Sequence, residues 1–361
     1  MSGPVDPPTL HVIVSSQRRG AEVFSQDLVG ELTRRGQPNR LVALRAADAE
    51  AALPVPVLGR RPLDVATLRA LRREVRSTGA PAVVAHGSRT LPACAVSLAA
   101  TGVPFAYRSI GDPRAWSASG LRRMRTTVAM RRARFVVVLW PGAADAVREH
   151  HGVPADRIRV VPNGVDGRRC PPAGDAERQR ARQALGLPAD AAVVAYAGSL
   201  TAEKRVHHAV EAVADVRGLH LLVAGSGPDR EALEARAARR AAGRVRFLGA
   251  LDDVSSVLAA ADAVVLTSTT EGMPGILVEA GLRARAVVAY DVGGVGEIVA
   301  DGETGCLVRS GDVPAFGAAM RRVLADAAAM GAAGRQRCLD RFEIGVVAGP
   351  WAELIAEMAP R

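Results

Sequence analysis

Two glutamates eight positions apart are the most informative feature of this chain. They bound the segment Glu271-Gly272-Met273-Pro274-Gly275-Ile276-Leu277-Val278-Glu279, which follows an apolar run. Pro274 suits the first turn of a helix, so Glu279 is expected inside that helix and Glu271 in the loop before it. The free N–H groups of a helix start favour a diphosphate, and carboxylates accept hydrogen bonds from sugar hydroxyls. Alternatively, Glu271 is an ordinary loop residue and Glu279 a solvated helix residue.

Lys204 is the only lysine in a chain that holds 46 arginines. It closes the run Ala197-Gly198-Ser199-Leu200-Thr201-Ala202-Glu203-Lys204, just after an expected strand and a glycine turn. An ammonium is a compact point charge, whereas a guanidinium is a planar fork. The lone lysine therefore indicates a position where only the compact charge serves, or it is a chance survivor on a solvated helix.

Two glycine-rich loops follow other expected strands. In Asp291-Val292-Gly293-Gly294-Val295-Gly296, the paired glycines allow the backbone to come close to a ligand, or only form a tight turn. The loop Gly225-Ser226-Gly227-Pro228-Asp229-Arg230 begins like a dinucleotide-binding motif, but Arg230 stands where the third glycine belongs. An NAD-dependent oxidoreductase is therefore disfavoured.

Expected strands and helices alternate along the whole chain, which predicts parallel sheets covered by helices on both faces. The expected helices include 21–35 and 68–76. A first series of strands is expected at 10–14, 41–44, 82–85, 105–107, 135–139 and 158–161, and a second at 192–197, 219–224, 245–248, 263–266, 286–289 and 306–308.

The pattern restarts after the turn residues Pro162-Asn163-Gly164. We therefore expect an α/β protein of two tandem doubly wound, Rossmann-like domains that face a cleft. The first covers residues 1–163 and the second 164–344, with a C-terminal helix near 345–361 packing back on the first. In open parallel sheets, ligands bind at the carboxyl ends of the strands, where all the loops described above are expected.

Composition narrows the class of protein. With 361 residues, 48% of them apolar, the chain suits two globular domains. No apolar run reaches the ~20 residues that span a bilayer. Met1–Pro8 lack the features of a signal peptide, so a cytoplasmic location is expected. Cys94, Cys170, Cys306 and Cys338 form no C-x-x-C pair, which indicates neither disulfides nor zinc.

The net charge of +10 is concentrated in the first half of the chain. Residues 1–165 carry 24 arginines against 12 acidic residues. Arg69, Arg72, Arg73 and Arg76 would share one helix face, and six more arginines fall within 121–134. These arginines form either a solvated surface or a face that docks on an anionic leaflet, near a lipid-linked acceptor. Nucleic acid is disfavoured as a partner, because aromatic residues make up only 3% of the chain.

In their order and spacing along the chain, these motifs resemble the retaining family-4 glycosyltransferases. The resemblance covers residues 158–310, including Val160-Val161-Pro162-Asn163-Gly164-Val165-Asp166 and Phe247-Leu248-Gly249, and extends to Gly20-Ala21-Glu22 and Val83-Val84-Ala85-His86-Gly87. It implies a GT-B fold, in which the second domain holds a nucleoside-diphosphate sugar and the first binds a hydroxyl acceptor. It also implies a hexosyltransferase of class EC 2.4 that retains the anomeric configuration.

The resemblance assigns roles to individual residues. The counterpart of Lys204 binds the donor diphosphate, that of Glu271 the donor sugar and that of Glu279 the ribose. The other expected donor-binding residues are Ser199, Arg205, Gly272, Met273, Pro274, Gly275, Ile276 and Leu277, and those expected on the acceptor side are Gly20, His86 and Arg108.

The chain departs from the family pattern at two points. The chain has Ser199 where the family often has an arginine that accompanies the lysine. Arg205 is not expected to replace that arginine, because neighbouring helical residues diverge by ~100° and Arg205 would point away from the direction of Lys204. The segment Tyr107-Arg108-Ser109-Ile110-Gly111-Asp112 lacks the histidine that many relatives carry near the reacting sugar. Asp112 and Arg108 are the polar residues of this segment that could act at the reacting sugar, with Asp112 the candidate for catalysis. Alternatively, both are ordinary loop residues. His86 is equally well a structural histidine at a strand end.

No metal or cofactor is expected, because the chain has no Asp-x-Asp pair and Lys204 with helix N-termini would stabilise the leaving diphosphate. The main alternative to an active transferase is a sugar-nucleotide-binding partner subunit or a pseudoenzyme, which Ser199 and the missing histidine motivate.

Overall fold

The computed structural model describes residues 6–48, 52–116 and 120–359. Two expectations fall partly outside these ranges. The absence of a signal peptide concerned Met1–Pro8, of which Met1–Val5 are not described, and the expected C-terminal helix included the last two residues, which are not described either. The chain forms two compact units. The N-terminal unit comprises residues up to Val165 together with Ile344–Arg361, and the C-terminal unit comprises Asp166–Glu343.

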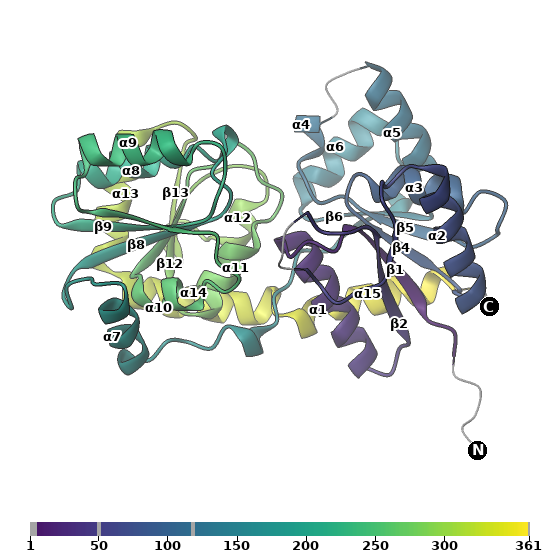
Figure 1. Cartoon of the computed structure of the whole chain (residues 1–361), viewed down its shortest axis with the longest axis horizontal. Coiled ribbons are helices and arrows are strands. Elements are labelled where there is room, and N and C mark those ends of the chain that lie inside the picture. The colour runs from purple at the N-terminus through teal and green to yellow at the C-terminus, as the bar shows by residue number, and fades with distance from the viewer. Residues whose placement is uncertain (1–5, 49–51, 117–119, 360–361) are drawn as a thin grey trace. The chain divides into compact units, whose positions relative to one another are not determined.

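A seven-stranded parallel sheet forms the centre of the N-terminal unit (Figure 1). Its order is β3-β2-β1-β4-β5-β6-β7, so the direction of winding reverses between β1 and β4. The strands are β1 (Thr9–Ser15), β2 (Asn39–Arg45), β3 (Val57–Gly59), β4 (Val83–His86), β5 (Phe105–Arg108), β6 (Phe135–Val138) and β7 (Ile158–Val160).

Helices cover both faces of this sheet (Figure 1). They are α1 (Gly20–Arg34), α2 (Val65–Thr78), α3 (Thr90–Ser97), α4 (Pro113–Trp116), α5 (Gly120–Arg132), α6 (Pro141–His151) and α15 (Ile344–Met358). Helices α1 and α15 lie on one face. In α15, apolar residues recur at helical spacing, so one stripe can be buried. Trp351 and Leu354 of that stripe pack with Phe24 and Leu28 of α1 over Phe135 of β6.

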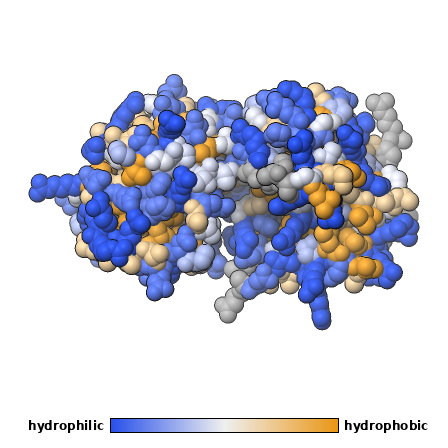
Figure 2. Space-filling model, turned by 90° about the horizontal axis from the view of Figure 1, so that it is seen from above, coloured by the Kyte–Doolittle hydropathy of each residue, from blue (hydrophilic) through white to orange (hydrophobic). Residues whose placement is uncertain are grey.

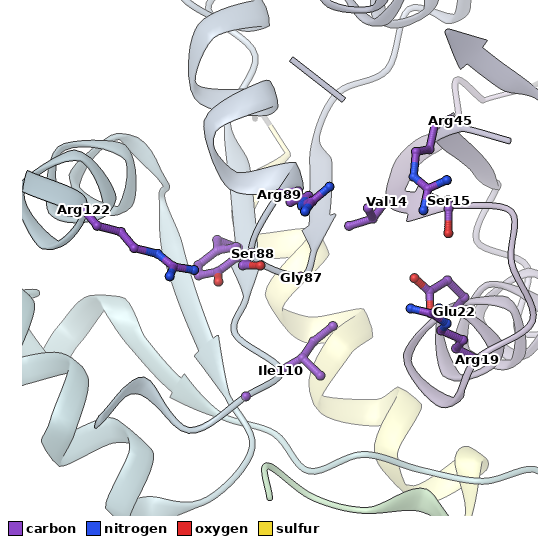
Figure 3. Close-up of a pocket in the computed structure, with 12 residues that line it drawn as sticks. Val14, Ser15, Arg19, Glu22, Arg45, Gly87, Ser88, Arg89, Ile110 and Arg122 are labelled. Carbon is purple, nitrogen blue, oxygen red and sulfur yellow. The ribbon is translucent and has the colours of Figure 1, made fainter. Parts of the chain in front are cut away.

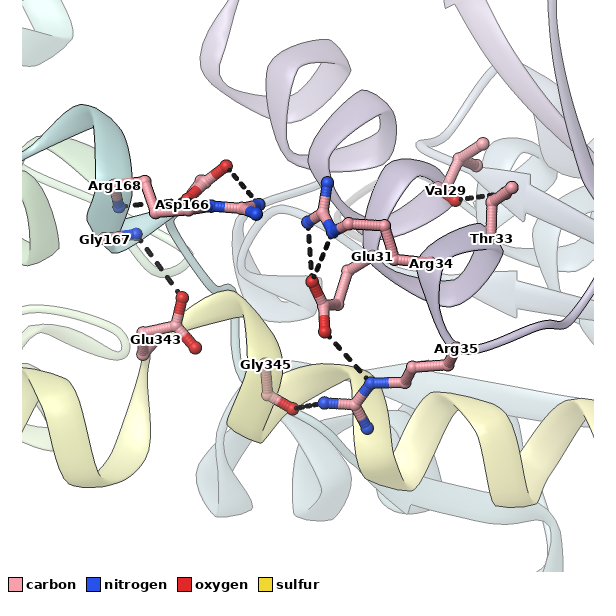
Figure 4. Close-up of polar contacts among 10 residues, drawn as sticks. All are labelled: Val29, Glu31, Thr33, Arg34, Arg35, Asp166, Gly167, Arg168, Glu343 and Gly345. Carbon is pink, nitrogen blue, oxygen red and sulfur yellow. Dashed lines mark hydrogen bonds and ion pairs between the residues drawn. The ribbon is translucent and has the colours of Figure 1, made fainter.

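Polar contacts also fix α15 to α1 (Figure 4). Glu31 of α1 accepts hydrogen bonds from Arg34 and Arg35, and Arg35 donates to the carbonyl of Gly345.

The chain passes between the units twice, and within each unit a hydrogen bond joins the two connecting segments. Ile344 N–H donates to the carbonyl of Val165 at 3.0 Å in the first unit. In the second, Gly167 N–H donates to the Glu343 carboxylate at 3.4 Å (Figure 4).

The C-terminal unit contains a six-stranded parallel sheet of order β10-β9-β8-β11-β12-β13, which reverses between β8 and β11. Helices α8, α9 and α13 lie on one face and α7, α10, α11 and α14 on the other (Figure 1). The strands are β8 (Ala192–Ala197), β9 (Leu219–Ala224), β10 (Val245–Gly249), β11 (Ala263–Leu266), β12 (Ala286–Tyr290) and β13 (Gly305–Val308). The helices are α7 (Asp175–Ala184), α8 (Val206–Ala214), α9 (Arg230–Arg240), α10 (Ser255–Ala260), α11 (Gly275–Leu282), α12 (Val295–Ile298), α13 (Val313–Ala325) and α14 (Ala327–Arg341).

The α/β class and the two Rossmann-like domains expected from the sequence are confirmed. The expected strands of the second sheet end within one residue of the observed ones. All four cysteines are buried and free. Within the described ranges, no helix combines the length and the apolar character needed to cross a bilayer.

Candidate functional site

Lys204 and Glu271 meet at the switch point of the C-terminal sheet. Strands β8 and β11 are neighbours, so the loops that follow them start side by side at the carboxyl edge. Lys204 closes a short 3-10 helix, Ala202–Lys204, after β8, and Glu271 lies in the loop between β11 and α11. Their side chains form an ion pair, with Lys204 Nζ 2.7 Å from Glu271 Oε1. The side chains are only 19% and 11% exposed, so solvent and salt screen their attraction less than that of a surface salt bridge.

Backbone contacts tie the same two loops together independently of the ion pair. The Thr269 N–H donates to the carbonyl of Glu203 at 2.8 Å. The Thr267 hydroxyl donates to the carbonyl of Lys204 at 2.9 Å. The positions of the lysine and of the glutamate are therefore set by the fold of the loops.

Glycines allow further loops to pack against these two. A Cβ added to Gly293, whose φ is +57°, would lie 1.8 Å from the carbonyl oxygen of Glu271. A Cβ on Gly225 would lie 1.8 Å from the carbonyl oxygen of Gly198. In addition, the Gly294 N–H donates to the carbonyl of Gly272 at 2.8 Å. The close approach expected from the sequence is thus an approach to the protein's own backbone, which fixes the Glu271 loop.

Helix α11 begins at Gly275, one residue later than expected, because Pro274 is its N-cap residue and not part of its first turn. The helix carries Glu279, which is half-buried. Around Gly275 the space is open, because no atom lies within 4 Å of an added Cβ. Met273 and Leu277 differ from the expectation. Their side chains are 4% and 0% exposed and belong to the core, so they support the loop from below. The half-buried Gly272 and Ile276 remain at the surface of the segment.

Ser199 and Arg205 flank Lys204 in the sequence. Ser199 is exposed, and its carbonyl accepts a hydrogen bond from the Tyr196 hydroxyl at 2.8 Å. Arg205 adopts a left-handed conformation, with φ at 44°, between the short helix and α8. Arg205 lies between the two helices, so the ~100° step between helical neighbours does not set its direction. A non-glycine residue in this region is strained, which is typical of functional loops.

The N-terminal unit has a cavity of about 430 Å³ at its own switch point, between the ends of β1 and β4 (Figure 3). Charged side chains from several elements project towards it (Figure 3). Its lining consists of Val14, Ser15, Arg19, Glu22, Arg45, Gly87, Ser88, Arg89, Tyr107, Ile110, Gly111 and Arg122. Burial raises the pKa of Glu22, although Arg19, Arg108 and Arg45 act in the opposite direction. The volume is within the range of small-molecule sites.

His86 and Arg108, expected on the acceptor side, do not line this cavity. Both are buried, at 2% and 0% exposure. The rings of His11 and His86 are joined by a 3.1 Å hydrogen bond, and Arg108 contacts His86 at 3.4 Å and donates to Asn163. Burial lowers the pKa of Arg108 to about 9 and that of His86 well below its usual value. The geometry corrects the expectation: these residues brace the strand ends beneath the cavity, and their neighbours Gly87 and Tyr107 face it.

Asp112 and Gly20 lie next to the cavity. Asp112 Oδ1 accepts a hydrogen bond from Arg114 Nε at 3.0 Å, and the same oxygen caps the Arg114 N–H. Its neighbour Gly111 lines the cavity. Gly20 begins α1 with open space around it, directly after Arg19. Within the described ranges, no three His, Cys, Asp or Glu side chains are grouped as metal ligands would be.

Five charged residues of the lining were not expected from the sequence as site residues: Arg19, Glu22, Arg45, Arg89 and Arg122. Glu22 could have been identified from the motif Gly20-Ala21-Glu22, and Arg89 from its position just after His86-Gly87. Arg45 ends β2 and Arg122 lies in α5, so only the folded sheet brings them together.

Two doubly wound units in tandem are the architecture of the GT-B class of glycosyltransferase folds. The chain matches the family model "Glycosyltransferase Family 4" over residues 18–169 and "Glycosyl transferases group 1" over residues 191–326. Because the two models together cover most of its length, the chain belongs to these glycosyltransferases.

Relatives of known activity match the chain over part of their length. The 2-deoxystreptamine glucosyltransferase of Streptomyces kanamyceticus is 34% identical over 232 residues, which cover 61% of this chain and 60% of the relative. The alpha-maltose-1-phosphate synthase of Mycolicibacterium smegmatis is 30% identical over 234 residues, which cover 60% of each chain. The chain thus spans about three fifths of these relatives.

A solved structure matches the whole fold. The crystal structure of Anabaena Alr3699/HepE in complex with UDP-glucose superimposes with a TM-score of 0.86, over 97% of this chain and 99% of that chain, at 20% sequence identity. This match confirms the fold.

Proposed function

We propose that the chain is a hexosyltransferase that moves a sugar from a nucleoside-diphosphate sugar to a hydroxyl acceptor, with retention of configuration and without a metal ion. The observation that carries the proposal is the partly buried Lys204–Glu271 pair at the switch point of the C-terminal sheet. One group is a cation for a diphosphate and the other an acceptor for sugar hydroxyls, and they are 2.7 Å apart. Expected from the sequence separately, the two residues are brought together by the fold.

The proposed chemistry needs little more than this arrangement. As the bond from the anomeric carbon to the diphosphate oxygen breaks, negative charge develops on that oxygen, and Lys204 stabilises it. The acceptor oxygen forms the new bond to the anomeric carbon, and its proton passes to the leaving oxygen. Donor binding draws the ammonium from Glu271 to the diphosphate, which frees the carboxylate to hold the donor hydroxyls. Glu279, further along α11, binds the ribose.

The names of similar proteins support the proposed class of donor. HepE was crystallised with UDP-glucose, and the Streptomyces kanamyceticus relative is named a glucosyltransferase. These names support a nucleoside-diphosphate hexose as the donor. We propose that the acceptor binds in the cavity of the N-terminal unit, because that cavity lies at the equivalent position on the other sheet.

The test is release of free nucleotide from a panel of nucleotide sugars, beginning with UDP-glucose, with and without acceptors. Glu271→Gln should lower kcat, because Glu271 orients the reacting sugar, whereas Glu279→Gln should raise KM and relieve product inhibition. Excess chelator should leave the rate unchanged. Binding of the donor without turnover in any combination would instead establish a sugar-nucleotide-binding partner or pseudoenzyme.

We also propose that the N-terminal unit docks on an anionic membrane surface. Helix α5 presents Leu121, Met124 and Val128, each 57% exposed, at helical spacing. Arginines interleave with them, and further apolar residues, Val65 of α2 and Val96 of α3, are 60% and 58% exposed. Figure 2 shows apolar side chains gathered among hydrophilic ones on this unit. An apolar row on a basic helix is typical of interfacial membrane helices.

A further inference from the structure

The cavity of the N-terminal unit carries more positive charge than the surrounding residues neutralise. Arg19, Arg45, Arg89 and Arg122 line it, whereas Glu22 is its only acidic lining residue. Arg19 and Arg89 directly precede α1 and α3, Arg45 ends β2, and Arg122 lies in the first turn of α5. Such a concave cluster of like charge creates a field that attracts anions.

Two of the four arginines have nearby carboxylates. Arg45 pairs with Asp48, with Nη1 2.6 Å from Oδ1, and Arg19 lies beside Glu22 (Figure 3). Among the residues that the structure describes, no carboxylate forms an ion pair with Arg89 or Arg122. These two guanidinium groups therefore account for the excess charge.

The remainder of the lining is uncharged and includes the apolar side chains of Val14 and Ile110. Gly87 has a φ of +93°, and a Cβ there would lie 3.2 Å from Ile110 Cδ1 and 3.7 Å from Val14 Cγ2. Any side chain at this position would fill the space beside Ile110 and Val14. The cavity thus combines an apolar floor, which suits the carbon face of a sugar or a polyol, with a cationic rim.

We propose that the acceptor is a sugar or polyol that carries a phosphate or carboxylate group, and that Arg89 and Arg122 bind this group in the cavity. Guanidinium groups match the geometry of both anions through paired N–H donors. The anionic group would anchor the acceptor, while its hydroxyl remains available for transfer. The inference rests on the proposed function only for the identity of the ligand as the acceptor.

The first experiment measures binding to the full chain by calorimetry at low salt. The probes are inorganic phosphate and matched anionic and neutral pairs: glucose 6-phosphate or glucuronate against glucose, and inositol 1-phosphate against inositol. We expect at least one anionic probe to bind at least tenfold more tightly than its neutral partner, in competition with inorganic phosphate. Arg122→Ala should weaken this binding at least tenfold.

Arg125→Ala is the matched control. It removes the same charge from the same exposed helix, but Arg125 does not line the cavity, so binding should change less than twofold. If no anionic probe binds more tightly than its neutral partner, or if both variants lose binding equally, the proposal is overturned.

A second arm separates a free anionic acceptor from a lipid headgroup. The same variants are tested against vesicles that contain phosphatidylglycerol. If the headgroup enters the cavity, Arg122→Ala weakens vesicle binding more than Arg125→Ala, and inorganic phosphate competes. If both variants lose vesicle binding equally and a free anionic probe still binds specifically, the cavity binds a free acceptor and not a lipid headgroup.

Titration with UDP separates this inference from the proposed function. UDP is expected to bind the C-terminal unit equally in the wild type, Arg122→Ala and Arg125→Ala. Anion binding that depends on Arg122 in a chain that never transfers sugar would support the cavity assignment and refute the transferase. If the chain transfers sugar to neutral acceptors only, and Arg122→Ala does not affect this transfer, the transferase is supported and the cavity assignment is refuted.

Discussion

Lys204 is the residue on which the proposed chemistry depends most. Its ion pair with Glu271 explains why an arginine is not equivalent: the ammonium reaches a single carboxylate oxygen at 2.7 Å between two loops that are fixed by backbone hydrogen bonds. A planar fork needs more space and a different direction of approach.

We therefore predict that Lys204→Ala lowers kcat by about 100-fold or more, the usual cost of losing one group that stabilises a developing anion. Lys204→Arg should also lose most of the activity, with an unchanged melting temperature. Steady-state kinetics with the preferred donor measure both effects. Wild-type rates in the arginine variant would refute the special role of the lysine.

The buried histidines predict how stability depends on pH. Burial lowers the pKa of His11 from 6.5 to about 4, against the hydrogen bond to Asn39, which raises it. Between these values the unfolded chain binds a proton that the folded chain does not, so stability is full above pH 6.5 and falls as the pH falls towards 4. The loss from His11 is about 3 kcal/mol at pH 4.

Thermal melts between pH 7 and pH 4 test this prediction. His11→Gln should flatten the dependence on pH in this window, whereas the control His150→Gln, at a half-buried position on α6, should keep the wild-type slope. Equal slopes in the two variants would show that the buried histidine pair does not control acid stability.

At the scale of elements, strands were predictable and the site only in part. Runs such as Ala192–Ala197 and Ala263–Leu266 are apolar and bounded by polar or turn residues, so their ends follow from the sequence. Strand β3, Val57–Gly59, was missed because it is a short, partly exposed edge strand. Lys204 and Glu271 were found because each follows a recognisable strand.

The N-terminal site could not be predicted to the same degree, because burial there depends on distant parts of the chain. The ring of His86 lies 6.0 Å from that of Trp351 on α15, and α15 covers the face of the sheet beneath the strand ends. No local pattern near His86 indicates this cover. The arginines of the cavity likewise converge from α1, β2, α3 and α5.

The glycine contacts between loops give a prediction at the same scale. Gly293→Ala places a Cβ 1.8 Å from the Glu271 carbonyl and also forces a left-handed alanine. Gly218→Ala is the control, because its φ of +72° imposes the same backbone cost in open space. We expect Gly218→Ala to lower the melting temperature by about 2–4 °C, the equivalent of ~1 kcal/mol.

Gly293→Ala should lower the melting temperature clearly further, and it should also reduce kcat, because the Glu271 loop must move away. Calorimetry and kinetics on the same preparations measure the two effects. Equal melting temperatures for the two variants would mean that the loop contact contributes nothing to the stability of the site.

At the scale of the whole molecule, the two halves of the chain differ in charge. The first 165 residues hold twice as many arginines as acidic residues, and the remainder is close to neutral. The cations of α2 and α5 accompany exposed apolar side chains, which a purely solvated surface does not require. This combination favours a membrane surface as the partner, with the acceptor drawn from or near it.

Cosedimentation with phosphatidylglycerol and phosphatidylcholine vesicles tests the docking. Of the four arginines expected on one face of α2, Arg72 is half-buried. Arg73 and Arg76 are exposed and are therefore the better positions for reversal to glutamate. Each cation near an anionic surface contributes about 1 kcal/mol, so the double reversal should weaken binding to phosphatidylglycerol vesicles more than tenfold.

Leu121→Ser with Met124→Ser should weaken the same binding at high salt as well, because apolar contact is not screened. Reversal of Arg239 and Arg240, exposed on α9 of the C-terminal unit, is the matched control and should have little effect. Binding to neutral vesicles should be absent at either salt concentration. If the wild type fails to sediment with anionic vesicles at low salt, docking is refuted, and the arginines of α2 and α5 form a solvated surface around a site that takes a soluble acceptor.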